Sequence, residues 1–150
     1  MNTNMRLITL IFILITPCWA AAQKFQENLK FSDLGGGEVI IDIIDNATNG
    51  CWTNIMEAKN YAAGQIDIIG GKVVETTKEA YAVFNISVSA ERIQPGLCYG
   101  FIDVKVYRPI NYDGKVVTAV FSETQQAGAN RTNFNNFVLD LIKKAVSEWR

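Results

Sequence analysis

The sequence contains no histidine and only three cysteines among its 150 residues. Without an imidazole group, the chain lacks the most common general acid and base, and it cannot assemble a Ser-His or Cys-His catalytic pair. A tetrahedral zinc site is disfavoured as well, because three thiols without a histidine cannot supply its four usual ligands. We therefore expect a protein that is not an enzyme and that holds no metal or cofactor.

The chain also lacks an excess of charge of either sign. Fourteen Lys and Arg residues stand against fifteen Asp and Glu residues, which gives a net charge of −1 at pH 7. This balance provides no positive field to attract DNA, RNA or anionic lipid. We expect no nucleic-acid partner, and membrane association only through a lipid attached at Cys18.

A short apolar run near the start predicts export. Residues 7–16 are apolar or uncharged, Arg6 precedes them, and alanines occupy positions 20–22. This layout is typical of a secretory signal peptide covering residues 1–22, and the run falls short of the roughly 20 apolar residues that span a bilayer. An uncleaved anchor is one alternative. A lipoprotein attached through Cys18 is another, although Pro17 stands where small residues are expected.

Cleavage after residue 22 would leave an N-terminal segment with a glycine linker, residues 23–37, and a single domain, residues 38–150. Two cysteines then remain, Cys51 and Cys98. In the oxidising environment of the periplasm or the extracellular space, these two predict a disulfide. A redox-active pair is disfavoured, because such pairs usually have Cys-x-x-Cys spacing.

Three consecutive strands are predicted over residues 80–90, 98–107 and 115–122, because apolar and polar side chains alternate with period two. One set of alternating residues is mainly aliphatic, and the other is mixed. This pattern predicts an antiparallel meander with one buried face and one wetter face. Asp113-Gly114 supplies the positive φ angles of a hairpin turn between the last two strands.

Two amphipathic helices are predicted, over residues 53–69 and 134–149, from apolar residues at three- and four-residue steps. Thr53 or Asn54 is the expected cap of the first helix, with Glu57 three residues after Asn54 as in a capping box, and Asn133 is the expected cap of the second. Residues 38–45 read as a strand covered on both faces, residues 72–76 as a short strand, and residues 125–132 as a polar loop.

The predicted order is therefore β-α-(β)β-β-β-α, an α+β two-layer sandwich with two helices packed on one face of a four- to five-stranded mixed sheet. In architecture alone, this order resembles the anticodon-binding-like modules of several bacterial envelope proteins. A fold does not determine a function.

Carboxylates offer the one catalytic alternative, a hydrolase that uses paired acids. Asp42 and Asp45 flank a strand end, and Asp103 lies in the middle of a strand on the wetter face. Each is better explained as a solubilising or capping residue, and the sequence shows no convergent polar cluster.

The wetter sheet face carries the candidate binding residues, Tyr81, Tyr99, Phe101 and Tyr107. Aromatic side chains beside charged ones are typical of recognition surfaces. We expect an interaction module that binds a protein partner or a second copy of itself through this face. The alternatives are that the N-terminal segment covers the face, that aromatics simply favour strands, or that the protein carries a small hydrophobic ligand.

Overall fold

The computed structural model describes residue 31, residues 37–76 and residues 80–150. The predicted signal peptide, Cys18 and the N-terminal segment other than Phe31 and Gly37 lie outside these residues. No helix within the described ranges is long and apolar enough to span a membrane.

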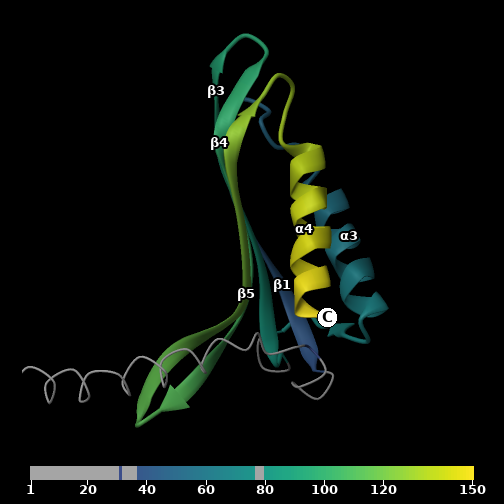
Figure 1. Cartoon of the computed structure of the whole chain (residues 1–150), viewed down its shortest axis with the longest axis vertical. Coiled ribbons are helices and arrows are strands. Elements are labelled where there is room, and N and C mark those ends of the chain that lie inside the picture. The colour runs from purple at the N-terminus through teal and green to yellow at the C-terminus, as the bar shows by residue number, and fades with distance from the viewer. Residues whose placement is uncertain (1–30, 32–36, 77–79) are drawn as a thin grey trace, which may run out of the picture.

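Two helices pack on one side of a five-stranded mixed sheet that does not close into a barrel (Figure 1). The predicted α+β two-layer fold is therefore confirmed. The elements are β1 (Glu38–Ala47), α3 (Ile55–Ile68), β2 (Lys72–Val73), β3 (Ala82–Gln94), β4 (Leu97–Tyr112), β5 (Lys115–Asn130) and α4 (Asn135–Trp149).

The sheet has the strand order β2-β1-β3-β4-β5. β1 runs parallel to both of its neighbours, and α3 forms the crossover from β1 to β2. β3, β4 and β5 form the antiparallel meander that the alternating pattern predicted. The helices cover one face, which we call the inner face. The opposite face, which neither of the described helices covers, is the outer face.

The inner face carries the aliphatic half of each alternating strand. Phe84, Ile86 and Val88 of β3, with Ile102 and Val104 of β4, are completely buried there. The predicted division of β3 and β4 into two faces is thus confirmed. β1 differs from its prediction, because its outer face is only partly covered and the Ile44 side chain is 43% exposed.

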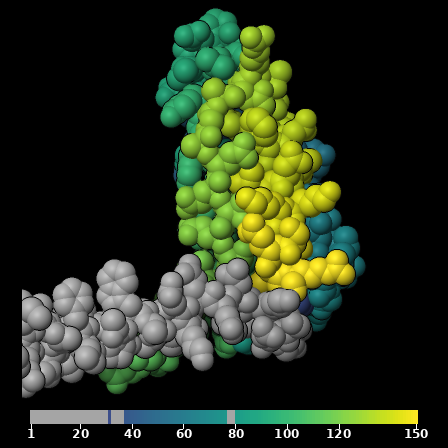
Figure 2. All heavy atoms as spheres, viewed as in Figure 1, coloured from purple at the N-terminus to yellow at the C-terminus, as the bar shows by residue number. Residues whose placement is uncertain are grey.

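α4 provides most of the helical contribution to the core. Its buried stripe recurs at three- and four-residue steps, as predicted, and consists of Val138, Leu141, Ile142, Ala145, Val146 and Trp149. Trp149 also packs edge-on against Phe31, with the ring centroids 4.7 Å apart. In the space-filling view, the atoms of α4 (yellow) adjoin those of the strands (green) on the face shown (Figure 2).

The helix starts differ in detail from the predicted caps. The Asn54 side chain donates a hydrogen bond to the Glu57 carboxylate and accepts one from the Trp52 indole, so it does not cap the backbone of α3. Asn133 accepts a bond from the backbone N–H of Asn135, where α4 begins. The capping-box prediction is wrong because Trp52, next to the helix start, occupies the Asn54 oxygen.

β4 and β5 are longer than predicted, and the polar loop predicted over residues 125–132 is wrong. β5 continues to Asn130 because its polar stretch pairs with residues 98–103 of β4. At the other end, Asp113 and Gly114 have φ angles of 51° and 74° and form the predicted turn. Residues 109–118, which we call the arm, are all exposed, and Figure 1 shows this end of the hairpin extending beyond the helices.

A covalent and hydrogen-bonded junction joins both helix starts to one end of the sheet. Cys51, before α3, is bonded through sulfur to Cys98 in β4, the pairing expected from the sequence. The Cys51 carbonyl accepts the backbone N–H of Phe134, just before α4. The Arg92 guanidinium donates to the carbonyls of Asn49 and Thr132 at 3.0 Å each. The junction therefore ties the loops that lead into both helices to this end of the sheet.

Candidate functional site

The four predicted aromatic residues lie in two places on the molecule. Tyr99 and Phe101 are on the outer face of β4, 56% and 39% exposed. Tyr107 is on the same face of β4 but six residues further along, and it is half-buried. Tyr81 precedes β3, packs against the core, and holds its ring 3.8 Å from the Arg108 guanidinium carbon. The structure therefore brings together two of the four residues.

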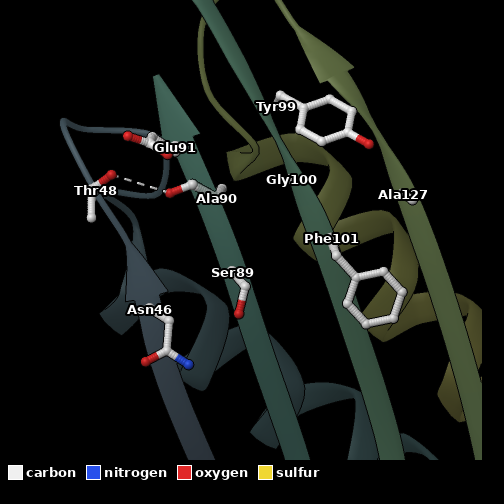
Figure 3. Close-up of a pocket in the computed structure, with 9 residues that line it drawn as sticks. All are labelled: Asn46, Thr48, Ser89, Ala90, Glu91, Tyr99, Gly100, Phe101 and Ala127. Atoms are coloured by element: carbon white, nitrogen blue, oxygen red, sulfur yellow. Dashed lines mark hydrogen bonds between the residues drawn. The ribbon is translucent and has the colours of Figure 1, made fainter. Parts of the chain in front are cut away.

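Tyr99 and Phe101 border an open depression of about 630 Å³ on the outer face, which we call the aromatic depression (Figure 3). Both rings lie toward β5, while Asn46 and Ser89 project from β1 and β3. Ala127 lies opposite Phe101 in the sheet, and its small side chain leaves the phenyl ring uncovered. The full lining is Asn46, Thr48, Ser89, Ala90, Glu91, Tyr99, Gly100, Phe101 and Ala127.

Backbone forms the floor of the aromatic depression. Gly100 lies opposite Ala90, and a Cβ atom added to it would stand 2.6 Å from the Ala90 Cα and would also clash with the Ser89 carbonyl. A glycine is thus required for β3 and β4 to approach this closely. The Thr48 hydroxyl donates to the Ala90 carbonyl at 3.4 Å and closes one side.

A second feature of the outer face, which we call the polar band, crosses four strands beside the aromatic depression. Register places Asp42 of β1 next to Asn85 of β3, Asn85 next to Lys105 of β4, and Lys105 next to Glu123 of β5. The Asn85 amide donates to the Asp42 carboxylate at 2.9 Å. The Lys105 ammonium is 2.7 Å from the Asp103 carboxylate and 3.9 Å from that of Glu123. We define the polar band as Asp42, Asn85, Asp103, Lys105 and Glu123.

The polar band corrects two expectations from the sequence. A convergent polar cluster does exist, and Asp103 is no solubilising residue, because it is only 7% exposed and ion-paired. Asn85 is 2% exposed. Alternation alone placed Asn85 and Lys105 on this face, but cross-strand register was needed to make them neighbours. Asp45 does act as a local cap, since it accepts the backbone N–H of Ala47.

The electrostatics of the polar band favour a protonated Lys105. Its ammonium donates a hydrogen bond to Asp103, and the negative charges of Asp103 and Glu123 add to this effect, so the pKa of Lys105 is raised despite the cost of burial. Two acceptors in the band lack a partner within the described residues, Oδ1 of Asn85 and Oδ1 of Asp103, and both atoms are buried. The band is therefore short of hydrogen-bond donors.

The raised pKa of Lys105 predicts a loss of stability in alkali. A lysine whose pKa is higher in the folded state stabilises the protein below its unfolded pKa, about 10.4, and loses this contribution as the pH rises through the folded value. We expect the free energy of unfolding to fall more steeply above about pH 10.4 for the wild type than for Lys105→Met. Urea titrations of both proteins at several pH values measure the difference. Parallel pH curves would show that Lys105 is not coupled to folding.

The described residues contain no group of three His, Cys, Asp or Glu side chains placed to hold a metal ion. A second cavity of about 490 Å³ lies at the sheet edge between α3 and the β1–β2 pair. Its lining includes Lys59 and Glu75 beside Ile40 and Val73, so it is mixed in polarity. The aromatic depression and the polar band remain the candidate functional site.

No protein-family model matches the chain, and comparison with curated proteins finds no relative. Among solved structures, the chain is similar to PelC from Paraburkholderia phytofirmans, a dodecamer, at 16% identity and a TM-score of 0.47 over 81% of this chain and 90% of that one. It is also similar to a minor lipoprotein from Acinetobacter baumannii, at 7% identity and a TM-score of 0.35 over 75% and 87% of the two chains. These likenesses are too weak to assign a function, a compartment or an assembly.

Proposed function

We propose that this protein is an exported, non-enzymatic interaction module that binds a protein partner through the outer face, with Tyr99 and Phe101 as anchors. The observation that supports it is the position of this pair. Two adjacent aromatic side chains are exposed at an open depression, on the sheet face that the described helices α3 and α4 leave uncovered.

The composition of the aromatic depression suits a protein interface. Aromatic side chains bury a large area on binding at a small entropic cost, and they dominate the energetics of many interfaces. Here they stand among polar groups, the Glu91 carboxylate and the side chains of Asn46 and Ser89. An apolar centre with a polar rim is the usual anatomy of a protein interface.

The backbone beneath these residues is held in place. The Gly100–Ala90 approach sets the spacing of β3 and β4, and the junction at Cys51 and Cys98 fixes the adjoining loops. A surface whose shape is set before binding loses less conformational entropy when a partner docks.

Two features support export to an oxidising compartment, the periplasm or the extracellular space. The first is the signal-like layout of residues 1–22. The second is the disulfide, because such bonds persist in oxidising compartments and are rare in the cytosol.

We expect the double variant Tyr99→Asp, Phe101→Asp to lose its partner while remaining folded. Docking would bury the two new carboxylates, which opposes binding. In the free protein both positions are exposed, so the free energy of unfolding should change little. Cross-linking in the native compartment, followed by mass spectrometry of the captured complexes, compares the variant with the wild type. Sedimentation velocity of the purified proteins shows whether the partner is a second copy.

Tyr112→Asp, Val116→Asp is the matched control, since these exposed residues lie on the arm, away from the aromatic depression. The proposal predicts that this control keeps the partner. If the Tyr99 and Phe101 variant retains every cross-linked partner and its oligomeric state, the outer face is not the interface.

A further inference from the structure

The polar band lies next to the proposed interface, but binding through Tyr99 and Phe101 gives the band no role. Its floor consists of two side chains that are more than nine-tenths buried, Asn85 and Asp103, and each has one buried oxygen without a hydrogen-bond partner among the described residues. A buried acceptor without a donor carries a desolvation cost, so its persistence calls for an explanation.

We propose that the polar band is a binding site for the ammonium or guanidinium group of a lysine or arginine side chain from the partner protein, and that Lys105 occupies it until the partner arrives. This inference rests on the proposed function for the partner's approach across the outer face. It adds the chemistry by which that partner is recognised.

The charges of the polar band favour a cation. Asp42, Asp103 and Glu123 contribute three carboxylates, and Lys105 is the single positive charge that faces them within the band. Two negative charges are therefore left over. The two unpartnered oxygens accept hydrogen bonds, and a protonated amine or guanidinium supplies only donors. Charge-assisted bonds of this kind are stronger than neutral ones.

The geometry of Lys105 shows that the site already accepts an ammonium group. Its nitrogen lies between the carboxylates of Asp103 and Glu123, at 2.7 and 3.9 Å, and its side chain is one third exposed. Because it contacts only one Asp103 oxygen, it leaves the other unpartnered. Because a third of its side chain is exposed, the Lys105 ammonium can move into solvent as the incoming cation takes over the ion pair with Asp103, so the buried carboxylate is not left unpaired.

The neighbouring aromatics suit the stem and charge of such a side chain. Phe101 and Tyr107 stand on either side of Asp103 and Lys105 along the outer face of β4. A cation that enters the polar band passes these rings, where cation–π attraction contributes further. A long side chain from a partner docked on Phe101 would therefore reach the band across adjoining residues of one strand.

The test measures binding of N-acetyl-lysine methylamide to the purified protein by NMR, following the side-chain amide signals of Asn85. The control probe is N-acetyl-norleucine methylamide, a neutral analogue that keeps the aliphatic side chain but lacks the ammonium group. We expect saturable shifts with the lysine probe and none with the norleucine probe. Lys105→Met, which removes the resident ammonium, should tighten binding of the lysine probe about ten-fold, a change of 1.4 kcal/mol.

Two variants of β1 form the matched pair. Asp42→Asn removes a carboxylate of the polar band and should weaken binding of the lysine probe about ten-fold, whereas Asp45→Asn removes an exposed carboxylate outside it and should leave binding unchanged. Equal effects of these two would mean nonspecific attraction and would overturn the proposal. So would weaker binding to Lys105→Met, or no saturable shift with the wild type.

These measurements are independent of the test of the proposed function, because they use the purified protein without its partner. If the lysine probe binds as expected and the Tyr99 and Phe101 variant keeps its partner, the cation site stands and the proposed interface fails. If the probe does not bind and that variant loses its partner, the interface stands and the cation site fails.

Discussion

Replacing Trp149 with alanine should lower the free energy of unfolding by about 3–5 kcal/mol, and Leu141→Ala by about 2–5 kcal/mol. Both side chains are buried on the face of α4 that meets the sheet. Truncation removes apolar surface from the core and leaves a cavity, and for Trp149 it also removes the edge-on contact with Phe31. Urea denaturation of each variant measures the loss.

Trp149→Phe separates packing from hydrogen bonding at this position. The Trp149 indole N–H has no partner in the described part of the chain, so a phenyl ring sacrifices volume but no hydrogen bond. We expect this variant to retain much of the stability that Trp149→Ala loses. A Leu141→Ala, Trp149→Ala double variant that melts at the wild-type temperature would show that α4 does not belong to the core.

Removing the disulfide, by Cys51→Ala with Cys98→Ala, should cost about 4 kcal/mol on the chain-entropy model. The bond closes a loop across a sequence separation of 47, which restricts the unfolded chain. Alanine is the suitable replacement because both positions are fully buried and a polar side chain there would add its own desolvation cost. Thermal and urea unfolding of the two proteins give the difference.

Reductant provides the control for this prediction. It should destabilise the wild type and leave the double alanine variant unchanged, since the variant has no bond between these positions to reduce. Intact-mass analysis of the protein from its native compartment identifies the bond and the N-terminus together. Free thiols on Cys51 and Cys98 would contradict the bond, a start at residue 23 would fit signal cleavage, and an acylated start at Cys18 would favour the lipoprotein alternative.

The sequence predicted the sheet faces well because alternation is a local property. Once Phe84 and Ile102 point inward, Asn85 and Phe101 must point outward, whatever the neighbouring strands do. The extent of β5 was missed for the opposite reason. Residues 125–130 contain no large apolar side chain and form an edge strand. Their backbone pairs with β4, but the sequence shows no alternating apolar pattern that would predict this.

The candidate site was predictable in part for the same reason. Alternation identified Tyr99 and Phe101 as outward-facing, but the polar band depends on which residues become neighbours across strands. Asp42 and Asn85 are 43 positions apart in the chain, and only the parallel β1–β3 register brings them together. Tyr81 lies one residue before β3 begins, where alternation no longer determines its direction, and it packs against the core.

The arm gives β4 and β5 two regimes of stability within a single pair of strands. Near Ile102, the pair is buried against the helices, so we expect it to open only when the whole domain unfolds. Residues 109–118 are exposed, and we expect them to separate at a lower free energy. Apart from the turn at Asp113 and Gly114, substitutions in the arm should therefore cost the domain little free energy. Such changes should also leave the aromatic depression and the polar band undisturbed, because neither includes a residue of the arm.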